Sequence, residues 1–80
     1  MLRILLIDDN PADRALAIRA LEREFPDLAL TEVASASEFE QAIAQGEFDV
    51  TVTDYQLRWS NGITVLRSLK AKFPDLPVVM

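Results

Sequence analysis

The chain contains no cysteine and no histidine, and this double absence removes several classes of chemistry. Without cysteine it can form no disulfide, thiolate nucleophile or zinc–thiolate site. Without histidine it has no imidazole base, no imidazole metal ligand and no residue that could become a phosphohistidine. Any chemistry must therefore come from carboxylates, hydroxyls and the backbone.

Long apolar runs are also missing. A membrane-spanning helix needs roughly 20 consecutive apolar residues, and no stretch of this sequence approaches that length. The first residues carry a single basic side chain, Arg3, and lead straight into Asp8. They therefore lack the apolar middle and small-residue cleavage site of a signal peptide. We expect a cytoplasmic protein that does not bind a membrane.

Positive charge is scarce. Eight lysine and arginine residues stand against 13 aspartate and glutamate residues, which gives a net charge of −5 at pH 7. Nucleic-acid-binding proteins usually gather basic side chains on one face, whereas those of this chain are scattered, so we expect no direct nucleic-acid binding by this segment. Half of the 80 residues are hydrophobic, which fits a single small globular domain with a thin core.

Hydrophobic periodicity and turn residues predict alternating strands and helices. The nearly continuous apolar run at 2–7 is typical of a strand that is buried on both faces of a parallel sheet. The expected elements, in chain order, are a strand at 2–7, a helix at about 11–25, a strand at 28–33, a helix between Ser35 and Gly46, a strand at 48–53, a helix from Asn61-Gly62 to about Phe73, and a strand that begins at Val78.

Local signals support the helix starts. Asn10 is a good N-cap and Pro11 a good first helical residue, while Ser35 with Glu38 three residues later forms a capping-box pattern. Three apolar stripes are expected to face the core. They consist of Ile18, Leu21 and Phe25, widened by Ala17, in the first helix, of Phe39, Ala42 and Ile43 in the second, and of Ile63, Leu66, Leu69 and Phe73 in the third.

This order of elements predicts a doubly wound α/β domain with a parallel sheet and right-handed crossovers. In such sheets the ligand site lies beyond the carboxyl ends of the strands, where the strand order reverses. For the order 2-1-3-4-5 that point falls between the first and third strands. These two strands end at Asp8-Asp9 and at Asp54, so three carboxylates are expected to meet at one sheet edge.

A cluster of three carboxylates needs a counter-charge. Two carboxylates about 4 Å apart repel by roughly 4 kcal/mol at an effective dielectric constant of 20, so the group would either take up protons or bind a cation. Oxygen ligands without imidazole or thiolate select Mg²⁺, Mn²⁺ or Ca²⁺. One or two carboxylates with water and a phosphoryl oxygen is the usual Mg²⁺ arrangement, which indicates phosphate chemistry.

The segments Ile4–Asn10 and Phe48–Leu57 resemble the first strand with its acidic pair and the third strand with its phosphoacceptor loop in receiver domains of two-component response regulators. Asn61-Gly62 is similar to the Asp-Gly that opens the third helix of that family. The resemblance spans the chain and implies the flavodoxin-like receiver fold. It also implies a signalling domain of a phosphorelay that catalyses only its own phosphorylation and dephosphorylation.

The resemblance also implies a role for each residue of the acidic site. A phosphohistidine on a histidine kinase or phosphotransfer protein would give its phosphoryl group to Asp54, which becomes a 4-aspartylphosphate. Mg²⁺ would be bound by the carboxylates of Asp9 and Asp54 and by the backbone carbonyl of Gln56, with Asp8 assisting directly or through water.

The sequence also departs from the family pattern. Arg58 stands where proline is common, and Trp59 is a bulky apolar residue in a loop expected to face solvent, where it would serve as a loop anchor or a contact residue. The chain ends at Met80, before the Thr or Ser and the Lys of the family's phosphate site, so residues 1–80 are expected to be a receiver domain truncated within or after the fourth strand. The open strand edge would then favour a homodimer or a swapped dimer.

Three other interpretations stay open. Asp8, Asp9 and Asn10 could serve only to cap the first helix. The chain could instead be a receiver-like protein-interaction module that is never phosphorylated. It could also be a metal-dependent phosphohydrolase with an aspartyl-phosphate intermediate, although such enzymes commonly place a second acid two residues after the nucleophile, where this chain has Gln56.

Overall fold

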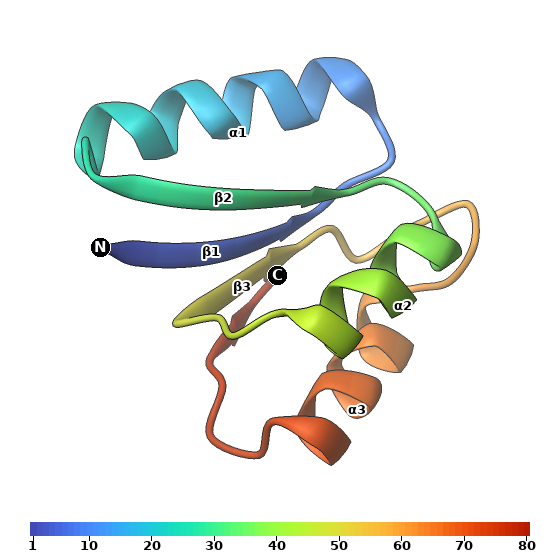
Figure 1. Cartoon of the computed structure of the whole chain (residues 1–80). Helices are drawn as coiled ribbons and strands as arrows, with labels where there is room; N and C mark the ends of the chain where they lie inside the picture. The colour runs from blue at the N-terminus through green and yellow to red at the C-terminus, as the bar shows by residue number, and fades with distance from the viewer.

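The computed structural model describes residues 1–80 and shows strands and helices in strict alternation (Figure 1). The elements are β1 (Leu2–Ile7), α1 (Pro11–Glu24), β2 (Leu28–Val33), α2 (Ala36–Gln45), β3 (Val50–Thr53), α3 (Gly62–Lys72) and β4 (Val78–Val79). No helix combines the length and the apolar character needed to cross a membrane.

The four strands form one parallel sheet in the order β2-β1-β3-β4. β1 therefore lies in the interior of the sheet, with β2 on one side and β3 on the other. Ile4 is in register with Val50, and Ile7 with Thr53, so β1 and β3 end at the same level. The predicted α/β class and strand order are confirmed.

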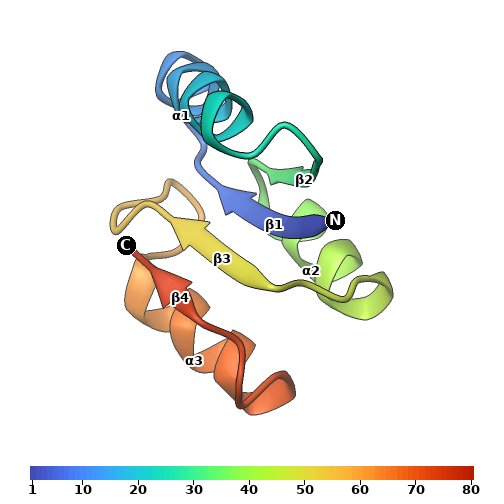
Figure 2. The same cartoon turned by 90° about the vertical axis from the view of Figure 1, so that its left-hand side faces the viewer.

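The helices cover the two faces of the sheet unequally. α1 lies on one face, and α2 and α3 lie on the other (Figures 1 and 2). Side chains of a strand alternate between faces: Leu5 and Ile7 belong to the core cluster beneath α2 and α3, while Ile4 and Leu6, also buried, point to the α1 side. β1 is thus buried on both faces, as its apolar run predicts.

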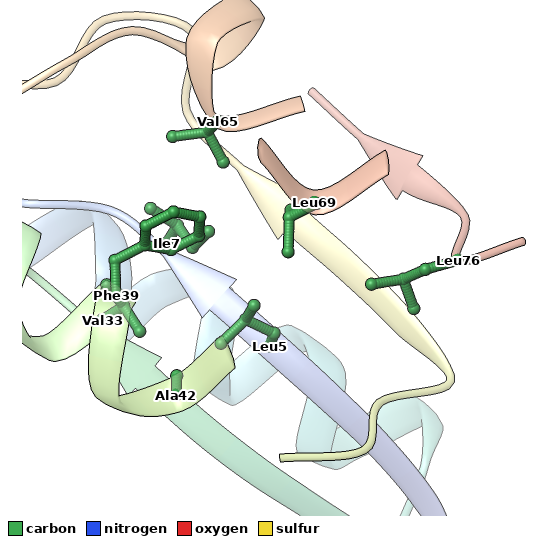
Figure 3. Close-up of a cluster of buried hydrophobic side chains, with 8 residues drawn as sticks. All are labelled: Leu5, Ile7, Val33, Phe39, Ala42, Val65, Leu69 and Leu76. Atoms are coloured by element: carbon green, nitrogen blue, oxygen red, sulfur yellow. The ribbon is translucent and has the colours of Figure 1, made fainter. Parts of the chain in front are cut away.

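Figure 3 shows the main core between the sheet and the helix pair α2 and α3. It consists of Leu5, Ile7, Val33, Phe39, Ala42, Val65, Leu69 and Leu76. These residues come from β1, β2, α2, α3 and the turn before β4, so this layer joins segments from one end of the chain to the other. Burial of this apolar surface is the main force that holds the sheet against the two helices.

The cap predictions are confirmed. The Asn10 side chain accepts the backbone N–H groups of Ala12 and Asp13, and Pro11 is the first residue of α1. At α2, the Ser35 hydroxyl accepts the N–H of Glu38 at 3.3 Å. The carboxylate of Glu38 reaches back one residue further than in the usual capping box, to the N–H of Ala34.

Two of the expected apolar stripes were partly wrong. α1 ends at Glu24, and Phe25 is its C-cap residue with 44% of its surface exposed. In α3 the buried residues are Gly62, Val65 and Leu69, which share one face of the helix, whereas Ile63 is 37% exposed. Ile63 follows Gly62 by one residue, a turn of about 100° around the helix, and so points away from the sheet.

The third strand is shorter than predicted because it begins at Val50 rather than Phe48. Asp49 lies outside the strand and bonds to Arg3 at the amino end of the sheet. Its N–H donates to the Arg3 carbonyl at 2.8 Å, and its carboxylate accepts the Arg3 N–H at 2.8 Å. Phe48 packs against the core from outside the sheet.

Candidate acidic site at the carboxyl edge of the sheet

The ends of β2, β1 and β3 are tied together by backbone hydrogen bonds. The N–H of Asp54 donates to the carbonyl of Ile7 at 3.0 Å, and the N–H of Asp8 donates to the carbonyl of Val33 at 3.1 Å. Thr53, the last residue of β3, is in register with Ile7, the last residue of β1 (Figure 1). Asp54 follows Thr53 and therefore lies next to the end of β1. The prediction that the two acidic strand ends are neighbours is confirmed.

Each of the three carboxylates accepts one backbone N–H with one of its oxygens. Oδ1 of Asp8 accepts the N–H of Asn10 at 2.9 Å, Oδ1 of Asp54 accepts the N–H of Tyr55 at 2.8 Å, and Oδ2 of Asp9 accepts the N–H of Arg58. Two of these bonds are local, and the third crosses to the loop between β3 and α3. The second oxygen of each carboxylate accepts no hydrogen bond from the protein.

The expected meeting of three carboxylate side chains is not seen. No group of three or more acidic side chains lies close enough together to hold a metal ion. The strand ends converge, but like charges repel, and each carboxylate is held by a different backbone amide. The predicted ligand set of Asp8, Asp9, Asp54 and Gln56 therefore stays a prediction.

The loop between β3 and α3 is closed by its own backbone. The N–H of Gly62 donates to the carbonyl of Tyr55 at 2.6 Å, and the N–H of Leu57 donates to the carbonyl of Ser60 at 3.2 Å. Gln56 and Asn61 face each other in an isolated bridge. The carbonyl of Gln56 accepts none of the loop's hydrogen bonds, so it remains available to a ligand.

Gly62 allows α3 to begin directly against the acidic strand end. A Cβ atom at this position would lie 3.0 Å from the Cα of Tyr55 and 3.2 Å from the carbonyl oxygen of Asp54. These are backbone atoms, which cannot move aside without shifting the acidic residue itself. Close packing therefore favours glycine here, and no unusual backbone angle is involved.

Trp59 anchors this loop to α2. Its ring lies 5.6 Å from that of Phe39, centroid to centroid, and it packs against the core cluster. The residue is half-buried, so the interpretation as a loop anchor is supported. Its indole Nε1 is buried and has no hydrogen-bond partner within the protein.

Arg14 is a part of this edge that the sequence prediction missed. Its Nη1 donates to the carbonyl of Asp8 at 2.7 Å, and its Nε lies 3.0 Å from Oε1 of Glu32 on β2. A signal was available: a cation close to the N-terminus of a helix opposes the helix dipole, so Arg14 in the early part of α1 needed a local partner.

Sequence comparison places this geometry in a known family. A family model described as the response regulator receiver domain matches residues 4–80. The chain belongs to the response regulator receiver domain family. It is therefore a signalling domain of the two-component type, and its fold and acidic edge can be compared with those of relatives.

Two curated relatives cover nearly all of this receiver domain. NtrC of Rhizobium meliloti, a DNA-binding transcriptional regulator, is 35% identical over 96% of the chain. A protein-glutamate methylesterase/protein-glutamine glutaminase of Rhodospirillum rubrum is 28% identical over 99% of it. The receiver domain spans only 16% and 20% of the lengths of these two proteins.

Among solved structures, the response regulator TrrA of Thermotoga maritima has the same fold. Its complex with Mg²⁺ and BeF superimposes with a TM-score of 0.85 at 24% identity over 98% of this chain and 66% of TrrA. TrrA in complex with the histidine kinase ThkA gives a TM-score of 0.83. At this level of identity the likeness shows the fold alone.

Proposed function

We propose that this receiver domain accepts a phosphoryl group on the carboxylate of Asp54. The observation that carries the proposal is the Asp54-to-Ile7 hydrogen bond at 3.0 Å, because it sets Asp54 beside the Asp8-Asp9 pair at the carboxyl edge of a parallel sheet. Membership of the receiver domain family links this acidic edge to phosphoryl transfer. The proposed donor is a phosphohistidine on a histidine kinase or phosphotransfer protein, and the ThkA–TrrA complex supports this kind of partner.

The chemistry of the available donors fits Mg²⁺. Each carboxylate of Asp8, Asp9 and Asp54 keeps one oxygen free of protein hydrogen bonds, and the Gln56 carbonyl is also free. Hard oxygen donors of this kind are those that Mg²⁺ prefers. We assign the metal to Asp9, Asp54 and the Gln56 carbonyl, with Asp8 direct or through water. The Mg²⁺ in one TrrA structure supports this assignment.

In the proposed transfer, an oxygen of Asp54 attacks phosphorus in line as the phosphorus–nitrogen bond of the phosphohistidine breaks and the imidazole leaves. Bound Mg²⁺ would neutralise charge on the carboxylate and on the transferring oxygens. The chain's own contribution is positioning: the N–H of Tyr55 bonds to Oδ1 of Asp54 and so restrains the orientation of the carboxylate, of which one oxygen would bind the metal and the other would attack. Water later hydrolyses the acyl phosphate and regenerates the carboxylate.

The direct test is incubation with a small phosphodonor and Mg²⁺, followed by intact mass spectrometry. We expect a gain of one phosphoryl group, none without Mg²⁺, and none with Asp54→Asn. Asp75→Asn removes the same charge from an exposed turn and should leave the gain intact. Full phosphorylation of Asp54→Asn, or no phosphorylation of the native chain, would reject the proposal.

A second candidate function is a receiver-like interaction module that is not phosphorylated. A specific feature favours it: an apolar groove of about 240 Å³ between α2 and α3, lined by Phe39, Ile43, Trp59 and Val65 among others. Absence of any mass gain, together with partner binding that survives Asp54→Asn, would support the module instead.

A further inference from the structure

Arg14 is the one basic side chain that bonds to the acidic strand end. Only 19% of its side chain is exposed, and it makes two polar contacts at once. Nη1 donates to the carbonyl oxygen of Asp8, and Nε pairs with Glu32 on the neighbouring strand. A guanidinium is suited to this because its donors are arranged in a rigid, planar fork.

The carbonyl that Arg14 holds belongs to the peptide that joins Asp8 to Asp9. A peptide unit is planar, so fixing its oxygen also fixes the direction in which the next residue leaves it. The other polar groups of Asp8 are held as well: its N–H bonds to Val33 and its carboxylate to the N–H of Asn10. Arg14 completes this set and so restrains the orientation of both acidic residues.

The direction in which Mg²⁺ affinity changes when Arg14 is removed distinguishes a role in orienting the peptide from a role as a positive charge. A guanidinium beside the acidic end of β1 would by itself weaken the binding of a cation there. Glu32 lies within ion-pair distance of Arg14 and offsets much of that positive charge. Removal of Arg14 should therefore weaken Mg²⁺ binding if the side chain orients the Asp8–Asp9 peptide, and strengthen it if the side chain matters only as a charge.

We propose that Arg14, held in place by its ion pair with Glu32, is a positioning residue that keeps the Asp8–Asp9 peptide in the orientation that binds Mg²⁺. This inference rests on the metal site of the proposed function. Partners that orient metal ligands from outside typically change metal affinity by about 10–100-fold when they are mutated. Arg14 would act in the same way, through the backbone instead of through a ligand side chain.

The test compares Mg²⁺ dissociation constants, read from the fluorescence of Trp59 and Tyr55 at a temperature where circular dichroism shows every variant folded. We expect Arg14→Gln to raise the dissociation constant about tenfold or more, and Glu32→Gln to raise it less. Arg14→Lys, which keeps the charge and one donor but loses the fork, should fall between the native chain and Arg14→Gln. Arg19→Gln removes the same charge from an exposed position of α1 and should leave binding unchanged or slightly tighter.

A second measurement is independent of the metal. Without Mg²⁺, amide exchange of Asp9 and Asn10 should be faster in Arg14→Gln than in Arg19→Gln, since only the former frees the Asp8 carbonyl. Arg14→Gln that binds Mg²⁺ as tightly as Arg19→Gln overturns the inference. A native chain that binds Mg²⁺ but gains no phosphoryl group overturns the proposed function and leaves this inference standing, whereas a chain that binds no Mg²⁺ overturns both.

Discussion

Asp9 and Arg58 are 49 residues apart in the chain, yet the carboxylate of Asp9 accepts the backbone N–H of Arg58. This bond joins the end of β1 to the loop that follows Asp54, and so connects two of the proposed metal-binding segments. Because it occupies only one carboxylate oxygen, it leaves the other for a cation. It therefore holds the loop in place without blocking the proposed site.

Substitution of Asp9 should separate the role of its hydrogen bond from that of its charge. Asp9→Asn keeps an oxygen acceptor and relieves repulsion among the three acids, so without Mg²⁺ we expect the free energy of unfolding to be equal to or above that of the native chain. Asp9→Ala loses the acceptor and should be less stable than Asp9→Asn by about 1–2 kcal/mol. Urea titration measures both, and equal stability of the two variants would contradict the structural role of the bond.

The unpartnered indole of Trp59 leads to a prediction about loop packing. Because Nε1 is buried without an acceptor, Trp59→Phe removes no hydrogen bond and should change the free energy of unfolding by less than about 1 kcal/mol. Trp59→Ala loses the ring that packs on Phe39 and should cost about 2 kcal/mol or more. Circular dichroism during urea unfolding reports both values. A Trp59→Phe variant as unstable as Trp59→Ala would indicate that the N–H is bonded after all.

The ion pair between Arg3 and Asp49 should make stability depend on pH. Hydrogen bonds from the Arg3 guanidinium, and then from its backbone N–H, lower the pKa of Asp49 below its ordinary value. Because the folded-state pKa is the lower one, the stabilisation is present above the unfolded-state pKa of roughly 4 and is lost as the pH falls through the folded-state pKa.

The measurement is the urea midpoint of the native chain and of Asp49→Asn between pH 7 and pH 3. We expect the native chain to be the more stable at pH 7 and the difference to shrink below about pH 4. It should also shrink in about 1 M salt, because both partners reach solvent. Asp75→Asn, at an exposed position, should show no comparable trend. A difference that grows toward low pH would contradict the assignment.

The exposed edge of the sheet predicts association of the 80-residue chain. β4 pairs only with β3, and Val79 and Met80 are 54% and 53% exposed. Unpaired apolar edge strands promote pairing with a second copy, so sedimentation velocity should show dimers that increase with concentration. Val79→Lys should reduce them, because a charged residue on an edge opposes pairing. A monomer throughout the concentration range would refute this prediction.

Much of the fold could be read from local patterns. The apolar run at 2–7 identified the interior strand, and Asn10, Ser35 and Gly46 identified helix boundaries because caps depend on neighbouring residues alone. The alternation of strands and helices predicted a doubly wound sheet, and the order of its strands was predicted from the resemblance to receiver domains. That Asp8 and Asp54 end adjacent strands could therefore be deduced, since parallel strands end at one edge.

Side-chain exposure was less predictable. Phe25 fits the stripe of α1 by spacing but caps the helix and is half exposed, and Ile63 in α3 points away from the core. In both cases periodicity indicates that one face is apolar, but which residues of that face reach the core depends on how the helix is seated on the sheet. That seating comes from packing between elements distant in the chain.

The sequence alone determined the chemical character of the chain, its order of elements and the position of the acids after two strands. These features depend on composition and on short-range periodicity, which can be read from the amino acids directly. Which hydrogen bonds form at this edge was decided only by the tertiary structure. They include the bond between Arg14 and the Asp8 carbonyl, the bond between the Arg58 N–H and the Asp9 carboxylate, and the bond of each carboxylate to its own backbone donor. They join α1 to β1 and β1 to a distant loop. Such contacts depend on the relative placement of whole elements, which no local pattern encodes.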